Sequence, residues 1–600
     1  MERDKVSYAA PKMKSYRQAD VELSDNVEYA THIPSDNRFA IVRHWLWPLY
    51  GAGLENLGRD GQPIQVPLPP CDAEHLLVRH DAVGLCFSDT KVIKAGEDHP
   101  RLGGRDMKED PVVLGHEVIL TVMEVGEKYA DRFNVGDRFI VQADIYYQGQ
   151  GLAYGYALQG GLSQYNLIGK EIIEGDEGCY LIPVAPETGY AQAALTEPWA
   201  CVLAAYNVDY RTAWKGGGSV LIVAGPGALD DYTLGEVYTK DAPPARVTTV
   251  GVDGNLRTQL EARAGAEGLA LSDVDGLSDL DENEQYDDIV LLGADADLYE
   301  ALEPRLANGG LINLVGAQAL TEPAHVDVGR LHYDDINVVG TTKSVVASGY
   351  EPIRVDLVPR GTCMLVGAAG PMGQMHFQRA LQAEESPCLI VATSRVMERL
   401  KLLKPKFARM IEEEGDKVRV IVRAFGPRPT PEFDRRLMAL TDDEGYDDIV
   451  VLAPSAEVMA DATTLVAPGG MINLFAGLPR GTLAEVDLAS LVRKGWRFTG
   501  SSGSSINDLR AMLDEAESGR LDPNLSVVAV AGLDHARRGL EGLMHQEFPG
   551  KVVVYPQILN FPLTYLEELE TVLPGVYEKL GPNHSWTVEA EAAFLEELLP

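Results

Sequence analysis

The feature that most constrains the fold is a long internal repeat in the second half of the 600-residue chain. Residues 286–290, YDDIV, recur as residues 446–450, and residues 309–314, GGLINL, recur as GGMINL at 469–474, both at an offset of 160. A period of this length is that of a whole domain and not of a solenoid unit. The sequence therefore predicts a duplicated domain.

Each copy opens with a buried strand and a glycine-rich turn. The first opening is SVLIVAGPG from Ser219 and the second is TCMLVGAAGPMG from Thr362, an offset of 143, so the second copy contains about 17 more residues between its opening and its later motifs. Strands then alternate with helical segments, which predicts a doubly wound parallel sheet. We place two tandem Rossmann-like domains at residues 216–350 and 351–545.

The segments on either side of the repeat have a different pattern. Residues 75–147 carry short strand-like runs broken by glycine and aspartate, such as PVVLGHEVILTVMEVG, which is typical of a β-rich module. After the repeat, GKVVVY at 550–555 reads as a strand returning to that module, and the acidic amphipathic tail beyond it is expected to pack as surface helices. The predicted β-rich domain is residues 1–215, and residues 546–600 return to it.

Composition excludes several classes of function. The net charge is −38, from 52 Lys and Arg against 90 Asp and Glu, and nucleic acid binding requires clustered cations instead. The chain has no apolar run long enough to cross a bilayer and no signal-peptide core at its start, so we expect a cytoplasmic protein without a membrane partner. Its six cysteines are too scattered to predict disulfides or a four-cysteine zinc site.

Three short motifs contain metal-ligating residue types. Cys86 lies in GLCFSD, His116 and Glu117 lie in GHE, and Glu197 lies in EPWAC. Thiolate, imidazole and carboxylate are the ligands of a catalytic Zn²⁺, which keeps one position open for water or substrate. Each motif alone is more typical of structure, because cysteine is often a small buried hydrophobe and a Gly-His-Glu can form a turn. Their ordered combination is more informative.

In this order, and ahead of a Rossmann-type strand, the three motifs resemble the zinc-dependent medium-chain dehydrogenase/reductase family, over roughly residues 70–560. The segments TGSSGSSINDLR, GYDDIVVLAP and GKVVVYPQILNFPLT are similar to members of the family that act on polyols and sugar phosphates. The resemblance implies an α/β multidomain fold with a GroES-like catalytic domain and Rossmann-like domains. It also implies one zinc per chain, because the four-cysteine structural lobe is missing, and a homodimer or homotetramer.

The resemblance further implies site residues. Cys86, His116, Glu117 and Glu197 form the zinc set, and it stays open which glutamate binds the metal and which binds a water on it. Because Glu117 is one of these two glutamates, the predicted catalytic residues include it.

Three residues just after Cys86 complete the predicted site. The resemblance implies that Asp89 orients the ligand histidine and that the Ser88 hydroxyl passes the substrate proton outward. Lys91 stands where many relatives carry the outer member of that relay. It serves the relay, holds a substrate phosphate, or is simply a solvated side chain.

The second copy has the better dinucleotide turn. Gly367, Gly370 and Gly373 stand at the three spaced positions, with Pro371 and Met372 opening the following helix. Glycines there let the backbone approach a pyrophosphate, which binds at the helix N-terminus. We therefore predict that this copy binds the cofactor.

In the first copy the outer glycines are replaced, by Ala224 and by Asp230, whose charge would repel a diphosphate. This copy is interpreted as a degenerate structural domain.

The residues at the end of the next strand bear on whether the cofactor is NADP(H) or NAD(H). In the second copy it reads LIVATS and continues to Arg395, so Ser394 and Arg395 suit a 2′-phosphate and favour NADP(H). In the first copy the strand leads to Asp253, an acidic end typical of NAD(H) binding. Two alternatives stay open: Ser394 and Arg395 are a helix cap and a solvated side chain, or the first copy binds the cofactor.

Together these observations predict a zinc-dependent oxidoreductase that transfers hydride between a nicotinamide cofactor and a secondary alcohol or ketone, on a polyol, sugar or sugar phosphate. The main alternative is a non-catalytic dinucleotide-binding sensor or scaffold with a vestigial zinc site. A lyase or zinc-free reductase of the same fold is a further one.

Overall fold

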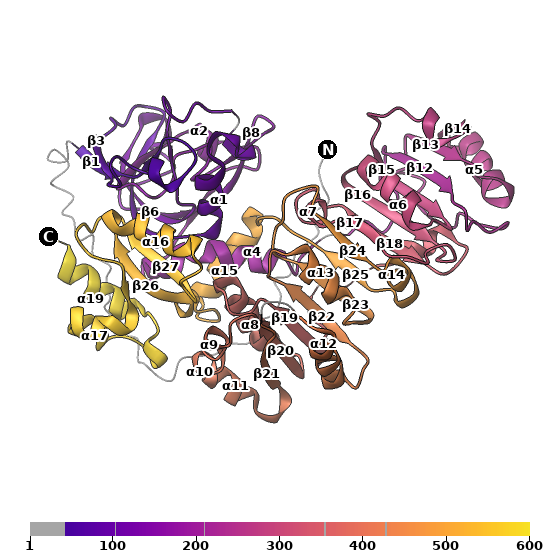
Figure 1. Cartoon of the computed structure of the whole chain (residues 1–600). Helices are drawn as coiled ribbons and strands as arrows, with labels where there is room; N and C mark the ends of the chain where they lie inside the picture. Colours follow the sequence, from indigo (N-terminus) through magenta and orange to yellow (C-terminus); the bar gives the residue numbers. More distant parts are fainter. Residues whose placement is uncertain are drawn as a thin grey trace.

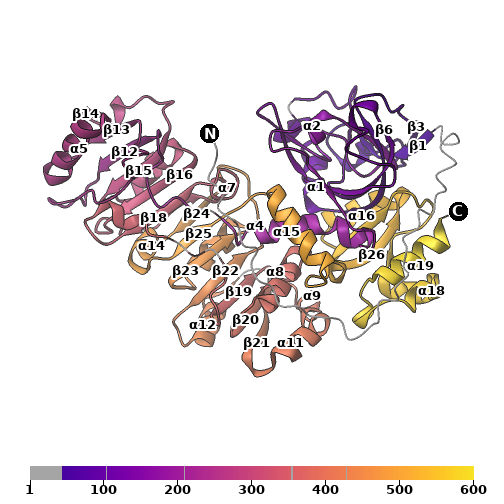
Figure 2. The ribbon, with the colours of Figure 1, turned by 180° about the vertical axis from the view of Figure 1, so that it is seen from behind.

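The computed structural model describes residues 43–102, 104–208, 210–352, 354, 356–426 and 429–599. Residues 1–42, with which the predicted catalytic domain begins, lie outside this part of the chain. Figure 1 shows three units in a row: a β-rich unit in indigo and purple, joined by yellow C-terminal segments, then the second Rossmann-like unit, then the first. The view from behind in Figure 2 has the same order.

The β-rich unit is built on one mixed sheet. Its described strands are ordered β11-β7-β6-β4-β27-β26-β28, with β10 beside β4. Their bounds are β4 (Leu76–Gly84), β6 (Glu117–Val125), β7 (Arg138–Val141), β10 (Tyr165–Ile168), β11 (Leu181–Pro183), β26 (Val527–Gly532), β27 (Lys551–Tyr555) and β28 (Thr564–Tyr565). β27 lies antiparallel to β4, so the C-terminal segment returns to this sheet. The proposed domain boundary at 545/546 falls between β26 and β27, which pair in parallel.

The two Rossmann-like units contain parallel sheets of identical order. The described strands run β14-β13-β12-β15-β16-β18 in the first unit and β21-β20-β19-β22-β23-β25 in the second. The first set is β12 (Ser219–Ala224), β13 (Arg246–Val250), β14 (Ala270–Val274), β15 (Tyr286–Leu292), β16 (Leu306–Val315) and β18 (Asn337–Thr341). The second is β19 (Thr362–Val366), β20 (Leu389–Ser394), β21 (Arg419–Ala424), β22 (Tyr446–Val451), β23 (Val466–Leu474) and β25 (Arg497–Thr499). The predicted fold class, a β-rich domain with two tandem doubly wound sheets, is confirmed.

The units differ between their strands. In the second unit α8 (Pro371–Gln382) follows β19, whereas residues 225–245, all described, contain no helix after β12. The additional residues of the second unit lie on both sides of β21. Before β21 this unit has α9 (Met397–Leu400), α10 (Leu403–Lys406) and α11 (Ala408–Glu414), whereas the first unit has the single helix α5 (Gly254–Glu267) before β14. After β21 the second unit has α12 (Pro431–Met438).

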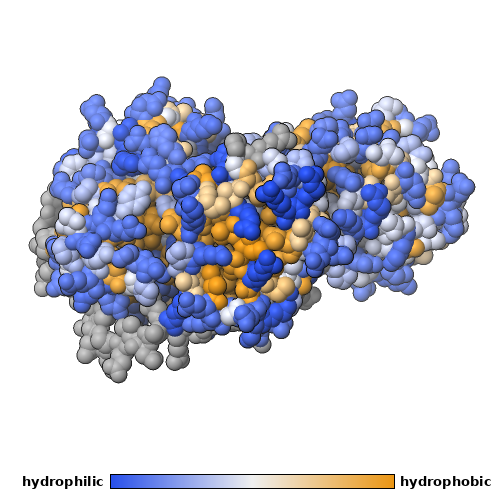
Figure 3. All heavy atoms as spheres, turned by 60° about the horizontal axis from the view of Figure 1, so that its bottom comes forward, coloured by the Kyte–Doolittle hydropathy of each residue, from blue (hydrophilic) through white to orange (hydrophobic). Residues whose placement is uncertain are grey.

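Hydrophobic packing places the second unit between the other two. One core joins the β-rich unit to one side of the second sheet, and another joins both Rossmann-like sheets. A third core lies within the first unit. Figure 3 shows mostly polar side chains on one face, with apolar ones gathered near the middle of the molecule. Among the described residues, every helix is too short or too polar to cross a bilayer.

Equivalent elements of the repeat meet where the two Rossmann-like units touch. β17 (Ala324–Asp327) pairs antiparallel with β24 (Leu483–Val486), and α7 (Val328–Tyr333) and α14 (Leu488–Lys494) follow them. Val328 and Leu488 are again 160 residues apart. A contact in which the same surface is used on both sides is isologous, as in a twofold dimer. Here the contact is formed within one chain.

Candidate active site

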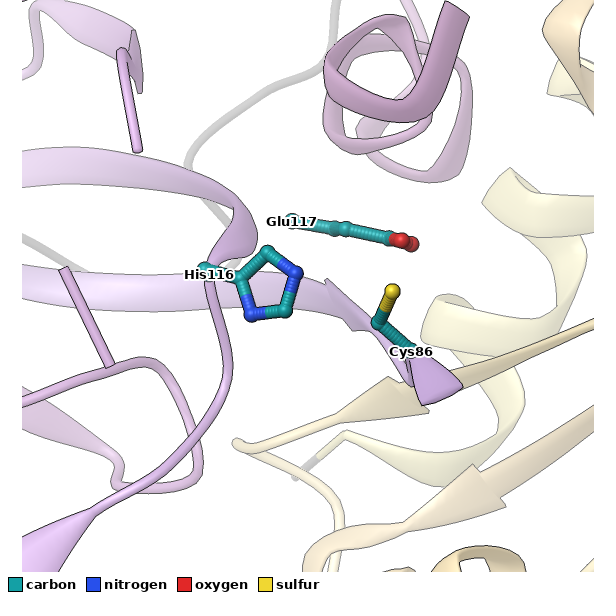
Figure 4. Close-up of side chains that lie close together, drawn as sticks. All are labelled: Cys86, His116 and Glu117. Carbon is teal, nitrogen blue, oxygen red and sulfur yellow. The ribbon is translucent and has the colours of Figure 1, made fainter. Parts of the chain in front are cut away.

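The register of two neighbouring strands brings the predicted metal ligands together. Gly84 at the end of β4 lies opposite Glu117 at the start of β6, so Cys86 just beyond β4 and His116 just before β6 reach the same edge. One ligand atom from each of Cys86, His116 and Glu117 lies within 4.8 Å of the others. Figure 4 shows the three side chains pointing toward one another. The set combines thiolate, imidazole and carboxylate, the ligand types of zinc.

Asp89 ties two of these residues together. It is the third residue of α1 (Phe87–Ala95), whose N-cap is Cys86, and it is fully buried. Its Oδ2 accepts a hydrogen bond from the Cys86 backbone N at 2.9 Å, and its Oδ1 lies 3.2 Å from His116 Nδ1. A carboxylate on Nδ1 orients the ring and leaves Nε2 for a metal. This position suits the orienting role expected of Asp89, which stays a prediction.

The carboxylate of Glu117 has two different environments. Its Oε1 is paired with Lys551 Nζ, at the start of β27, while the buried Oε2 has no hydrogen-bond partner among the described residues. A Cβ at Gly84 would lie 2.2 Å from this Oε2, so the strand leaves room for the carboxylate only because residue 84 is glycine. An unpartnered buried oxygen beside a thiol and an imidazole fits a metal ligand.

Glu197 lies outside the group of three. It is in the first turn of α4 (Thr196–Ala204), buried, and its Oε1 is 3.9 Å from Cys201 Sγ. Burial, to which the charge of Glu117 adds, raises the pKa of Glu197 to about 7. The geometry thus favours Glu117 over Glu197 as the carboxylate of the cluster.

The other predicted residues lie on the first turns of α1. Ser88 is half-buried, and Lys91, one turn further on, is also half-buried, with its Nζ 3.4 Å from the hydroxyl of Tyr333. The ring of Tyr156 lies 5.6 Å from that of His116, and the Arg101 guanidinium lies over the same tyrosine.

The glycine turn of the second unit has the shape of a dinucleotide site. Gly367 follows β19 at φ +95°, and Gly370 caps α8, where an added Cβ would meet nothing within 4 Å. A Cβ at Gly373 would lie 2.5 Å from Ala368 Cα, so this glycine is needed for the packing of helix on turn. Pro371 and Met372 form the first turn of α8, whose free N–H groups favour an anion.

Ser394 and Arg395 lie beside this turn. Ser394 ends β20, and the backbone N of both Gly367 and Ala368 donates to the carbonyl of Thr393 at 2.9 Å. Arg395 is exposed, and the next helix, α9, has Val396 as its N-cap, so Ser394 is not a helix cap.

The corresponding turn of the first unit lacks such a site. No helix begins in residues 225–245, all of which are described, so no helix N-terminus follows the carboxyl end of β12. Gly227 N instead donates to Gly293 O at 2.8 Å, which closes the turn on its own sheet. Asp230 is exposed, and the missing helix is a stronger obstacle than its charge.

Sequence reasoning missed Lys551, Tyr156, Arg101 and Tyr333. Lys551 lies within the quoted GKVVVY strand, but its partner Glu117 is 434 residues away. Each of the four is near the site only because of tertiary contacts, and the sequence offers no local signal for them.

Comparisons with known proteins agree with this arrangement. The model of the alcohol dehydrogenase GroES-like domain matches residues 72–174, and that of the zinc-binding dehydrogenase family matches residues 371–518, in the second Rossmann-like unit. An L-sorbose 1-phosphate reductase from Klebsiella pneumoniae is 21% identical over 536 residues, 88% of this chain and 93% of the relative.

Other relatives cover less of the chain. A mannitol-1-phosphate 5-dehydrogenase from Aliivibrio fischeri is 28% identical over 47% of this chain and 72% of its own length, and a sorbitol dehydrogenase from Bombyx mori is 35% identical over 13% of this chain and 21% of its own. The structure of 2R,3R-butanediol dehydrogenase from Bacillus subtilis covers 86% of this chain and 99% of its own, with 16% identity and a TM-score of 0.49. The order of the two matched domains, together with the relatives, shows that the chain belongs to the alcohol dehydrogenase-like family of medium-chain dehydrogenases/reductases.

Proposed function

We propose that this protein is a zinc-dependent, NADP(H)-linked dehydrogenase that interconverts a secondary alcohol and a ketone on a polyol, sugar or sugar phosphate. The observation that carries the proposal is the cluster of Cys86, His116 and Glu117 within 4.8 Å, with one carboxylate oxygen of Glu117 buried and unpartnered in the described part of the chain. A vestigial site in a sensor or scaffold would not need this set of ligand atoms.

The residues present suit one zinc ion per chain. Cys86, His116 and Glu117 would hold it, and it would supply Lewis acidity that polarises the substrate oxygen. Asp89 holds Cys86 and His116 in register through its two oxygens. The Ser88 hydroxyl takes the proton from the substrate oxygen and passes it outward. His116 and Glu117 are buried, which keeps these two ligand side chains away from bulk water.

The cofactor is assigned to the second Rossmann-like unit. Its pyrophosphate would bind at Gly370 and the N-terminus of α8, and the 2′-phosphate of NADP(H) would be held by Ser394 and Arg395. The nicotinamide supplies the hydride chemistry, while the protein positions the two reactants. We retain a homodimer or homotetramer as the expected assembly, to be measured by light scattering.

The decisive experiment combines a metal assay with a screen of polyols, ketoses and their phosphate esters at the nicotinamide absorbance. We expect about one zinc per chain and turnover that both disappear in Cys86→Ala, while Cys388→Ala, an exposed cysteine far from the cluster in sequence, keeps both. Ser88→Ala should keep the zinc and lower the rate by about 10²-fold or more. Full metal content and activity in Cys86→Ala would refute the assignment.

A further inference from the structure

The first Rossmann-like unit reaches the active site through one corner. α7 ends at Tyr333, and the hydroxyl of this residue lies 3.4 Å from Lys91 Nζ on α1 of the β-rich unit. Lys91 follows Cys86 by five residues, about 7.5 Å along a helix axis. The tyrosine therefore lies within reach of a substrate that also contacts the metal cluster.

The second Rossmann-like unit holds this corner in place. The Arg480 guanidinium lies over the ring of Tyr333, 5.4 Å from its centre, and Arg480 Nε donates to Asp334 Oδ1 at 2.7 Å. A Cβ at Gly477 would lie 2.5 Å from the Tyr333 hydroxyl and 2.7 Å from His332 Nε2. Only a glycine at 477 leaves space for both side chains, so Tyr333 is a positioned group and not a loose surface tyrosine.

The charge around Lys91 is not neutralised. Within the described residues Lys91 has no ion-pair partner, whereas nearby Arg101 is paired with Asp144. Burial, with the charge of Lys91 adding to it, lowers the pKa of His332 to about 4, so this imidazole is neutral. In a chain with a net charge of −38, a half-buried ammonium without a carboxylate partner and beside a hydroxyl donor is suited to bind an anion.

We infer that Lys91 and Tyr333 bind the phosphate group of a phosphorylated polyol or ketose, so that the first Rossmann-like unit supplies a specificity-determining residue to the active site. This inference rests on the proposed function for the reaction itself. It gives the first unit, which lacks a dinucleotide turn, a role in substrate recognition. Arg480 acts through Tyr333 and is a positioning residue.

The test compares kcat/KM for a phosphate ester with that for the same polyol without phosphate. In Tyr333→Phe and in Lys91→Met we expect this ratio to fall about 10-fold or more, mainly through KM of the ester, because a hydrogen bond to a charged group is lost. The matched control is Arg493→Ala, since Arg493 stands 160 residues after Tyr333 at the equivalent place in α14 and is more than half exposed. It should leave the ratio unchanged.

An unchanged ratio in Tyr333→Phe would overturn the inference. A second measurement is independent of turnover: inorganic phosphate should raise the melting temperature of the zinc-loaded wild-type protein, and this shift should be lost in the Tyr333→Phe, Lys91→Met double variant. If no substrate is turned over, the proposed function fails, but loss of the phosphate shift in the double variant would still support the anion site. An equal shift in both proteins would reject it.

Discussion

The two Rossmann-like units share their strand order and a set of hydrogen bonds at equivalent positions, together called the frame. They differ in the turn that would bind a dinucleotide. In each unit the strand that begins with the repeated YDDIV motif contains two aspartates. One is buried and is paired with an arginine outside the sheet, and the other accepts a hydrogen bond from the backbone at the start of the unit's first strand. The equivalent pairs are Arg211 with Asp288, Arg354 with Asp448, Ser219 N with Asp287, and Thr362 N with Asp447.

The difference lies at the carboxyl ends of the first strands. The second unit continues into α8 through Gly367, Gly370 and Gly373, whereas the first continues into irregular chain that closes on Gly293. The comparison teaches that the packing frame and the dinucleotide turn depend on different residues. A duplicated domain can lose the turn and keep the frame, because the frame is buried and carries the stability of the sheet.

The largest expected difference is in the affinity for NADPH, between the variants Gly373→Asp and Asp230→Ala. The new side chain at 373 would collide with Ala368 and place a negative charge at the N-terminus of α8, so NADPH affinity should fall about 100-fold or more. Asp230→Ala should leave it unchanged, because no helix begins there. Fluorescence titration with NADPH and NADH measures both. If Gly373→Asp binds as tightly as wild type, the second unit is not the cofactor site.

The contact between the units is tested by a second matched pair, Asp327→Ala and Asp487→Ala, which are 160 residues apart. Buried Asp327 accepts from Gly329 N and Arg330 N in its own unit and from Gly481 N in the other, at 2.7 to 3.1 Å. Its loss should cost about 2 to 3 kcal/mol.

Exposed Asp487 accepts a hydrogen bond from Ser490 N and forms an exposed ion pair with Arg493 at 3.7 Å, so Asp487→Ala should cost about 0.5 to 1 kcal/mol. Denaturant unfolding followed by circular dichroism compares the two variants. Equal losses of unfolding free energy in the two variants would show that the contact between the units depends no more on Asp327 than on Asp487.

The variants Arg395→Ala and Asp253→Ala together test which cofactor binds and in which unit. If Arg395 holds the 2′-phosphate, its removal should weaken NADPH about 10-fold and leave NADH nearly unchanged. Asp253→Ala, at the end of the corresponding strand of the first unit, should change neither. A fall in NADH affinity in Asp253→Ala would instead assign the cofactor to the first unit.

The smallest expected effect concerns pH. Burial raises the pKa of Asp288 and of Asp448 from 3.8 to about 6, although Arg211 and Arg354 act in the opposite direction. The folded carboxyls hold their protons more tightly than the unfolded ones, so their contribution to stability is complete below about pH 4 and is lost as the pH rises through about 6. Asp448→Asn and Asp288→Asn should each reduce this dependence by on the order of 1 kcal/mol.

Unfolding free energies at several pH values between these limits measure the effect. Should only one of the two variants change the pH profile, the frames of the two units would not be equivalent.

The sequence by itself determined the duplication, the doubly wound parallel sheet of each copy and the three ligand types that the structure finds clustered. These follow from local patterns: a repeat at fixed offset, alternating buried strands and helices, and short motifs at strand ends. Cys86, His116 and Glu117 were predicted together from their motifs and the family resemblance, and the antiparallel pairing of β4 with β6 brings them to one edge of the mixed sheet.

The tertiary structure alone decided which groups surround them. Lys551 meets Glu117 across 434 residues, Glu197 lies outside the cluster, and Tyr333 arrives from the unit at the far end of the molecule. The missing helix after β12 was not predicted either, although residues 225–245 differ from the equivalent residues 368–388 at almost every position. Such contacts depend on how buried faces of separate sheets fit together, and side-chain patterns along one segment do not contain that information.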